Sequence, residues 1–225
     1  MIDVLYEDNH IIAVSKPAGI PVQKGRGDKS LDLMVKDYLK NKYKKPGNVF
    51  LGIVHRLDQP VSGIILFAKT SKGASRLSEQ FRAKELEKTY RAILTGKLKQ
   101  KKGALKSQII KERGGSFRAI INNSSTDKLV SEKGKEAVLE YKVVKEGAFN
   151  SLAEIKLETG RFHQIRAQFA SIGHPVLGDV KYGSPTVLAD GKIALHSSRL
   201  IFMTATGDRK VELASPDPLY FKDIL

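Results

Sequence analysis

Apolar residues in the first third of the chain alternate between short strand-like runs and one stretch with helical spacing. Residues 4–14 carry apolar side chains on both sides of a polar break at residues 7–10, which predicts two short strands joined by a turn. Apolar residues at helical spacing follow Ser30, a typical N-cap residue, and predict a helix that ends near Leu39. The run at residues 64–68 is short, apolar and partly β-branched, as expected for a buried strand.

The remaining sequence predicts more strands than helices. A second helix is expected with Ser71 as its cap, and a short third helix from about His163 that Gly173 terminates. Residues 97–133 are rich in Lys, Gly, Ser and Asn, which favours exposed hairpins and loops and makes them a candidate RNA-gripping arm. Further strands are predicted at residues 90–94, 138–144, 151–157, 194–203 and 210–213. The pattern indicates a strand-rich α+β fold.

Composition and charge restrict the function. With 225 residues and 41% hydrophobic side chains, the chain is expected to form a single domain over residues 1–225. The net charge of +15 makes a polyanion, above all nucleic acid, the expected partner. We expect a cytoplasmic protein with no membrane association, because the sequence contains neither a long apolar stretch nor an N-terminal signal pattern. The lack of cysteine excludes disulfides and thiolate chemistry.

Candidate functional residues gather in three blocks. Asp58 lies in a polar turn just before the apolar strand, where a scaffold can hold a carboxylate toward a cleft, although Asp is also common in turns for structural reasons. Tyr90 lies among cations and offers a face for stacking a base, although a Tyr that begins a strand usually packs in the core. Arg166, near the start of the third helix, can reach a carboxylate or phosphate, with surface charge as the simpler interpretation.

Three motifs, in this order, relate the chain to a known family. They are His55-Arg56-Leu57-Asp58-Gln59-Pro60-Val61-Ser62-Gly63, then Lys88-Thr89-Tyr90-Arg91-Ala92, then Thr159-Gly160-Arg161-Phe162-His163-Gln164-Ile165-Arg166 with Gly178-Asp179 and Tyr182-Gly183. With these motifs the chain closely resembles the RluA-type RNA pseudouridine synthases. Three positions depart from the pattern: Val61 and Phe162 replace the usual Thr, and Gln168 replaces a frequent His.

The resemblance implies an enzyme that isomerises uridine in ribosomal or transfer RNA to pseudouridine without a cofactor or a metal. It implies a mixed, mainly antiparallel sheet with flanking helices and loops that form a central RNA-binding cleft. Asp58 corresponds to the catalytic carboxylate, acting as a nucleophile or as a base that promotes glycal formation. Arg166 corresponds to the arginine that pairs with it and Tyr90 to the stacking residue. Arg56 corresponds to the residue that helps displace the target nucleotide, and Ile165 is expected to contact the substrate.

Many relatives carry an N-terminal S4-type RNA-binding module, whereas this sequence begins with the catalytic motifs. Target choice is therefore expected to rest on this domain or on another factor. The chemistry needs no obligatory protein partner, and a monomer is expected.

Two other hypotheses remain. A non-catalytic RNA-binding or ribosome-assembly protein that retains the fold fits the basic charge equally well. A metal centre built from His55, His163, His174 and His196 with Asp58 or Asp179 is the other, although no HxH or HExxH spacing supports it.

Overall fold

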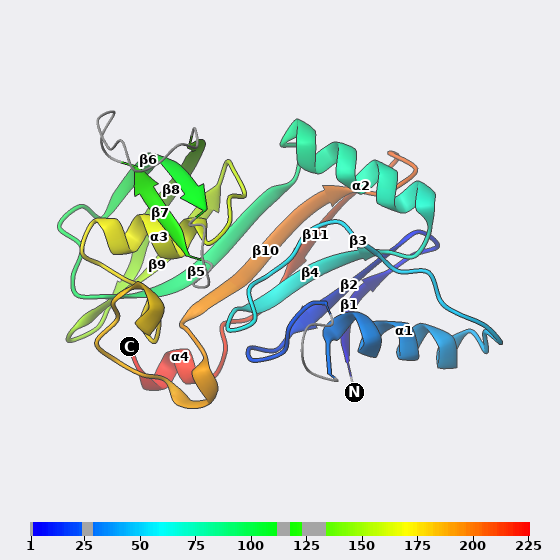
Figure 1. Ribbon diagram of the computed structural model, residues 1–225, viewed down its shortest axis with the longest axis horizontal. Helices are drawn as coiled ribbons and strands as arrows, with labels where there is room; N and C mark the ends of the chain where they lie inside the picture. The colour runs from blue at the N-terminus through cyan, green and yellow to red at the C-terminus, as the bar shows by residue number, and fades with distance from the viewer. Residues whose placement is uncertain (1, 24–28, 112–117, 123–133) are drawn as a thin grey trace. The chain divides into compact units, whose positions relative to one another are not determined.

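The structure is a computed structural model that describes residues 2–23, 29–111, 118–122 and 134–225 (Figure 1). The chain divides into two compact units. Unit 1 comprises Met1–Lys88 and His196–Asp217, and unit 2 comprises Thr89–Leu195 and Pro218–Leu225. Because compact units of this size occur both within one domain and as separate domains, the single domain stays a prediction.

Unit 1 is built on a mixed sheet. Its strands are β1 (Asp3–Glu7), β2 (Ile11–Lys16), β3 (Gly52–Ile53), β4 (Ser62–Ala68), β10 (Leu195–Met203) and β11 (Lys210–Ala214). Strand order in this unit is β1-β2-β4-β10, with β3 paired to β4 and β11 paired to β10. The β4–β10 pair is parallel, whereas β2 pairs with β4, and β10 with β11, in antiparallel register.

Two helices belong to unit 1, α1 (Leu31–Lys42) and α2 (Ser71–Ala83). Helix α1 begins after Ser30 as predicted but continues three residues beyond Leu39, into the basic run. The cap of α2 is Thr70 and not Ser71. The Thr70 hydroxyl accepts a hydrogen bond from the Gly73 N–H at 3.1 Å, which supplies the partner that a first-turn N–H group lacks.

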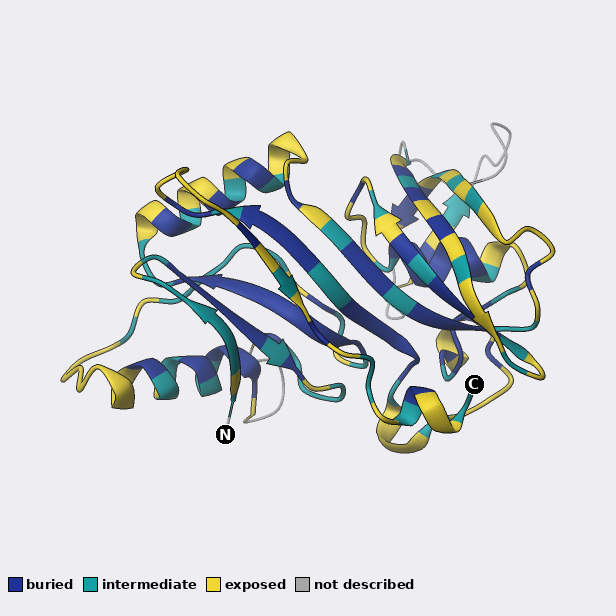
Figure 2. Cartoon of the chain, turned by 180° about the vertical axis from the view of Figure 1, so that it is seen from behind, coloured by how far each residue is buried: buried dark blue, intermediate teal, exposed yellow. Residues whose placement is uncertain are grey.

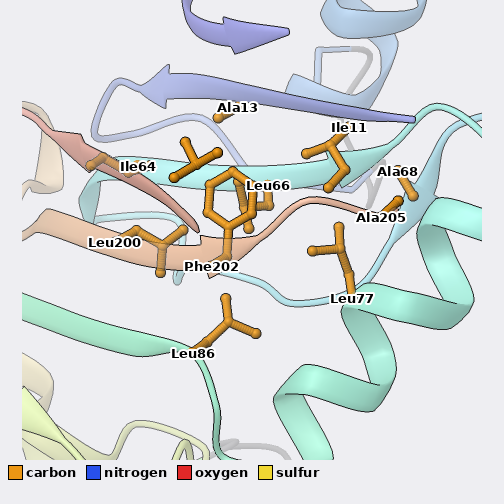
Figure 3. Close-up of a cluster of buried hydrophobic side chains, with 11 residues drawn as sticks. Ile11, Ala13, Ile64, Leu66, Ala68, Leu77, Leu86, Leu200, Phe202 and Ala205 are labelled. Atoms are coloured by element: carbon orange, nitrogen blue, oxygen red, sulfur yellow. The ribbon is translucent and has the colours of Figure 1, made fainter. Parts of the chain in front are cut away.

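The core of unit 1 lies between the sheet and α2. Figure 3 shows Ile64, Leu66 and Phe202 of β4 and β10 facing Leu77 of α2. All seven residues of β4 are buried, so that both faces of this strand are covered, whereas the two helices alternate buried and exposed positions (Figure 2). Strand β4 is therefore the rigid centre of the unit, and the Asp58 turn leads directly into it.

Gly63 brings β10 unusually close to the beginning of β4. The parallel register places His196 opposite Ser62 and Ser197 opposite Gly63. Gly63 has a φ of +116°, and a Cβ atom at this position would lie 2.3 Å from the Ser197 carbonyl oxygen. Only glycine satisfies both the conformation and the spacing, so the approach of β10 to the residues after Asp58 depends on it.

Unit 2 contains a second, antiparallel arrangement of strands. Its elements are β5 (Glu87–Thr95), β6 (Lys102–Lys111), β7 (Ala119–Asn122), β8 (Lys135–Glu146), β9 (Asn150–Leu157), α3 (Gln164–Ser171) and α4 (Tyr220–Asp223), with short 3-10 turns at Val180–Tyr182 and Ala189–Gly191. Strand order in this unit is β5-β9-β8-β6-β7. Helix α3 packs on β6, β7 and β8 through a small cluster of Ile109, Ala119, Ala137, Ala167 and Tyr182.

The predicted α+β class and mainly antiparallel pairing are confirmed, and the strands expected from the sequence are present. Strand β6 is longer than the brief hairpin elements expected in the arm at residues 97–133. Parts of that arm, residues 112–117 and 123–133, lie outside the described residues. The central RNA-binding cleft stays a prediction. Across the described ranges, none of the helices combines the length and apolar character that crossing a bilayer requires.

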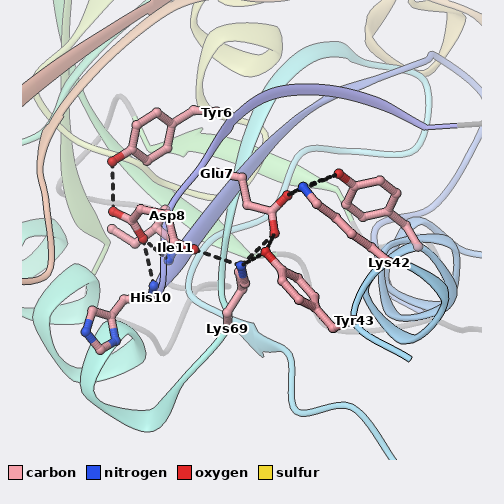
Figure 4. Close-up of polar contacts among 9 residues, drawn as sticks. Tyr6, Glu7, Asp8, His10, Ile11, Lys42, Tyr43 and Lys69 are labelled. Atoms are coloured by element: carbon pink, nitrogen blue, oxygen red, sulfur yellow. Dashed lines mark hydrogen bonds and ion pairs between the residues drawn. The ribbon is translucent and has the colours of Figure 1, made fainter. Parts of the chain in front are cut away.

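A buried carboxylate, Glu7, ties β1 to α1 and to the end of β4 (Figure 4). Its oxygens accept from Lys42 Nζ at 2.7 Å, from Lys69 Nζ at 2.6 Å and from the Tyr43 hydroxyl at 2.7 Å. Only 9% of the Glu7 side chain is exposed. Burial by itself would raise the pKa of Glu7, but the hydrogen bonds from these donors outweigh it and lower the pKa to about 2.

We predict that Glu7→Gln lowers the free energy of unfolding by about 1–3 kcal/mol at neutral pH, because the nearly buried Lys69 ammonium group loses a charged acceptor, whereas the exposed Lys42 and Tyr43 add little. The folded-state pKa lies below the ordinary value of 4.5. The contribution of Glu7 is thus fully present above about pH 4.5 and is lost as the pH falls through about 2. The difference between wild type and Glu7→Gln should shrink over this interval in urea titrations.

Glu79→Gln is the matched control, because Glu79 pairs with Arg76 on the exposed face of α2. It should change stability by less than about 0.5 kcal/mol. A Glu7→Gln protein as stable as this control at neutral pH would contradict the structural role of Glu7.

Candidate active site

The Asp58 turn is the first part of the site and belongs to unit 1. Asp58 is half-buried and Arg56 exposed, whereas Leu57 between them is buried and anchors the loop. The Val61 N–H donates to the Asp58 carbonyl at 3.0 Å and closes a β-turn. The Gly19 N–H donates to the Gln59 carbonyl at 2.8 Å, and the Gln59 side-chain amide donates back to the Gly19 carbonyl at 3.0 Å. The Asp58 backbone is thereby held on both sides.

Lys16, the last residue of β2, supports this turn with a buried ammonium group. Its side chain is 1% exposed, and Nζ donates to the carbonyl oxygens of Val61 at 2.6 Å, Gln59 at 3.0 Å and Pro17 at 3.0 Å. Burial lowers the pKa of Lys16 to about 8, and the negative charge of Asp58 opposes that shift. The Lys16 ammonium group therefore binds carbonyls of the turn that carries Asp58 and attracts the Asp58 carboxylate.

His55 fixes the other end of the loop. The Leu66 N–H donates to His55 Nε2 at 2.9 Å, so that this nitrogen must be unprotonated. The imidazole also lies against the Phe81 ring, with 4.9 Å between the ring centroids. Burial, and then the charge of Lys88, lowers the pKa of His55 to about 3. His55 is thus a neutral structural acceptor that joins the loop to β4.

The polar contact between Ser62 and His196 completes the support. Ser62 Oγ and His196 Nδ1 form a buried hydrogen bond of 2.8 Å. It links the beginning of β4 to the beginning of the unit 1 portion of β10, where Gly63 permits their close approach. The turn that carries Asp58 is therefore bound to β2, β4 and β10.

Arg166 is the centre of the second part of the site, in unit 2. It lies on α3 and is 5% exposed. Its Nε donates to Asp179 Oδ2 at 2.6 Å and its NH2 group to Oδ1 at 2.8 Å, which makes a bidentate ion pair with a carboxylate that is 1% exposed. The Arg166 guanidinium also lies over the Tyr182 ring at 5.0 Å. These two contacts fix the direction of the guanidinium within unit 2.

Tyr182 connects Arg166 to the turn before α3. Its hydroxyl accepts the Ala119 N–H at 2.7 Å and shares a 2.8 Å hydrogen bond with His163 Nδ1. Burial raises the pKa of Tyr182 to about 12, so the hydroxyl keeps its proton at neutral pH. Because the hydroxyl already accepts from Ala119, it can donate that proton to His163.

The remaining candidates also lie in unit 2. Tyr90 is in β5 with 9% of its surface exposed, and Ile165, beside Arg166 on α3, is 4% exposed. Asp58 and Arg56 belong to unit 1, so the pairing of Asp58 with Arg166 and the stacking role of Tyr90 stay predictions.

The histidines of the metal hypothesis have separate hydrogen-bond partners. His55 accepts from Leu66, His163 bonds Tyr182, His174 bonds the Thr95 carbonyl and His196 bonds Ser62. No group of three or more His, Asp or Glu side chains within the described ranges is arranged to hold a metal ion. Neither unit by itself, over its described residues, therefore supports the hypothesis of a metal centre built from these histidines with Asp58 or Asp179, which stays a hypothesis.

Comparisons with known proteins agree with the motifs. The family model described as RNA pseudouridylate synthase matches residues 10–171. An uncharacterised RNA pseudouridine synthase of Bacillus subtilis, YhcT, is 36% identical over 99% of this chain and 71% of the relative. Ribosomal large subunit pseudouridine synthase C of Buchnera aphidicola is 30% identical over 99% of this chain and 69% of the relative. The solved structure of human RNA pseudouridylate synthase domain containing 4 shares the fold, with a TM-score of 0.78 and 22% identity over 98% of this chain and 90% of that one.

The fold and the family model define the class of protein as an RNA-modifying isomerase. The chain belongs to the RNA pseudouridylate synthase family and, within it, to the RluA type. The reaction of this family converts uridine in RNA to pseudouridine, and the resemblance inferred from the three motifs is confirmed.

Sequence reasoning overlooked two supporting residues. The sequence pattern assigns no role to Lys16, and it names Asp179 only as a motif position or a metal ligand. The signal for Asp179 was its place in the Gly178-Asp179 motif. For Lys16 no local signal exists, because its acceptors Gln59 and Val61 are 43 and 45 residues away.

We predict that Lys16→Met, which keeps the length of the side chain, lowers the free energy of unfolding by about 1–3 kcal/mol because the carbonyls of Pro17 and Val61 lose a buried donor. It should also reduce pseudouridine formation, since the Asp58 turn loses its central support. Thermal melting and an assay of tritium release from RNA that contains 5-tritiated uridine measure the two effects. Lys72→Met on the exposed face of α2 is the control and should change neither. Equal behaviour of the two variants would refute the supporting role.

Proposed function

We propose that this chain isomerises one or more uridines of large-subunit ribosomal RNA to pseudouridine, with Asp58 as the catalytic carboxylate. The observation that carries the proposal is the Asp58 turn, in which the backbone that carries a half-buried Asp58 is held by backbone hydrogen bonds and by the Lys16 ammonium group. The name of the Buchnera relative, ribosomal large subunit pseudouridine synthase C, supports the choice of RNA. Transfer RNA remains the other substrate implied by the motifs.

The chemistry explains why one carboxylate can suffice. The bond between ribose C1′ and uracil N1 breaks, the base turns, and a new bond joins C1′ to C5. The proton on C5 leaves and N1 gains one, so all the heavy atoms of the product come from the substrate and no electrons are exchanged. The proposed enzyme accordingly uses no cofactor.

Asp58 acts in one of two ways in this proposal. It attacks C1′ as a nucleophile, or it removes a proton from the sugar and promotes a glycal. Either route needs an ionised carboxylate with a fixed direction, and the Lys16 ammonium group binds the turn that carries it. The hydrogen-bonded turn supports the fixed direction.

The other candidates hold the substrate in the proposal. Arg166 pairs with Asp58 when RNA is bound, and its orientation depends on Asp179. Tyr90 stacks on the target base and Ile165 contacts it, while Arg56, exposed on the Asp58 turn, occupies the space that the flipped nucleotide leaves.

The +15 net charge supports RNA binding by this chain alone. The proposal further includes a monomer that acts in the cytoplasm without an obligatory partner protein.

We predict that Asp58→Asn reduces tritium release from 5-tritiated large-subunit ribosomal RNA at least about 100-fold, because the amide can act neither as nucleophile nor as base. Binding of the same RNA should stay close to that of the wild type. Asp3→Asn, at an exposed position of β1, is the control and should leave tritium release unchanged. Normal turnover by Asp58→Asn would disprove its catalytic role. RNA binding by the wild type with no tritium release would favour the non-catalytic alternative.

We predict that Tyr90→Phe retains most of the activity and that Tyr90→Ala loses it at least about fivefold, because only the ring provides a stacking surface. Single-turnover tritium release at saturating enzyme compares the two variants, and circular dichroism checks that both are folded. Equal activity of the two folded variants would count against stacking. An equal loss of activity in both would show that the Tyr90 hydroxyl, and not the ring, is the important group.

A further inference from the structure

Two rings at the beginning of α3 form a stack on the surface of unit 2. The rings of Phe162 and His163 lie 3.8 Å apart between centroids with an interplanar angle of 19°. Phe162 is 39% exposed, whereas His163 is half-buried. The exposed ring therefore rests on a second ring and not on the aliphatic core.

The backbone and Tyr182 hold this stack in place. His163 adopts a left-handed conformation with a φ of +52°, which is uncommon for residues other than glycine, with Asn, Asp and His the most frequent exceptions. Its Nδ1 bonds the Tyr182 hydroxyl at 2.8 Å, and its ring meets the Tyr182 ring edge-on at 5.6 Å. On the other side, Gln164 Oε1 accepts the Arg161 N–H at 3.0 Å. These contacts hold the backbone on both sides of Phe162, and the His163 ring supports one face of its side chain.

One cation contacts the exposed ring, and a second lies over the neighbouring Tyr182 ring. Lys111 Nζ lies over the Phe162 ring at 5.3 Å, and the Arg118 guanidinium over the Tyr182 ring at 5.0 Å. Lys111, Arg118 and Arg161 are all exposed. An aromatic face bordered by Lys and Arg is the arrangement with which proteins bind single-stranded nucleic acid, with bases on the rings and phosphates on the cations.

We propose that Phe162, supported by His163, is a stacking platform for an unpaired nucleobase of the RNA substrate, a second base besides the target uridine. This rests on the proposed function only in taking RNA as the ligand.

The base enters on the ring face that Lys111 covers. An exposed cation–π contact favours its geometry by roughly two- to fivefold, whereas stacking of a base on an aromatic side chain contributes roughly five- to 150-fold. The base therefore displaces the ammonium group, and the flexible Lys111 side chain can turn to a neighbouring phosphate without losing its favourable charge.

The test measures binding of two probes to the full chain by fluorescence anisotropy. One probe is a short fluorescein-labelled oligouridylate, and the other is an abasic oligonucleotide of the same length, which keeps the phosphates without the bases. We expect Phe162→Ala and Phe162→Thr to weaken oligouridylate binding at least about fivefold and to leave abasic binding unchanged. Phe162→Trp should retain or strengthen oligouridylate binding.

Phe149→Ala is the matched control, because Phe149 is 83% exposed in the turn between β8 and β9. It should change neither affinity. Equal binding by Phe162→Ala and the wild type overturns the platform, as does an equal loss for both probes. Should Phe162→Ala unfold in thermal melts, Phe162→Thr and Phe162→Trp decide the matter.

Tritium release by the same wild-type preparation separates this inference from the proposed function. If the wild type releases tritium but substitution of Phe162 does not change oligouridylate binding, the platform is refuted and the isomerase function is retained. If substitution of Phe162 weakens only oligouridylate binding and the wild type releases no tritium, the platform is supported and the proposed substrate or catalytic assignment is refuted.

Discussion

The Lys16 ammonium group carries a charge into the interior of unit 1, where an unpaired ion would strongly destabilise the fold. It is tolerated because the carbonyls of Pro17, Gln59 and Val61 replace its hydration and because the negative charge of Asp58 acts on it. The same bonds hold the turn that presents Asp58. The stability of the unit and the orientation of its candidate catalytic group thus depend on one set of contacts. A change at Lys16 or in the Asp58 turn disturbs both.

Unit 2 also buries a cation, but pairs it directly with a carboxylate. The buried Arg166 is neutralised by Asp179 in a bidentate pair and is flanked by Tyr182. Loss of one partner from such a pair leaves a buried charge, which typically costs about 3–5 kcal/mol. Tyr182 also bonds His163, and His163 stacks on Phe162. The rings before α3 and the guanidinium on α3 therefore belong to one connected set of contacts.

An RNA-modifying enzyme needs affinity for phosphates and a means of selecting bases. The net charge of +15 provides the first in a form that does not distinguish sequences. Aromatic faces provide contacts to bases that have left the helical stack. Phe162 offers such a face at an exposed position, whereas Tyr90 is almost fully buried in unit 2. In the two proposals, Phe162 and Tyr90 therefore bind different bases, one near the surface and one drawn into the protein.

The sequence by itself determined the alternation of strands and helices, the basic character, the family and the candidate role of Asp58, because periodicity, composition and motifs are local properties. It missed the full length of β6, since both faces of that strand carry polar residues and its pairing with β7 and β8 makes it a strand. Only the tertiary structure decided that Lys16 supports the Asp58 turn, that Asp179 binds Arg166 and that Phe162 stacks on His163. The first two contacts depend on the tertiary fold, which brings together residues that are apart in the sequence, whereas the stack of Phe162 on His163 depends on the left-handed backbone of His163.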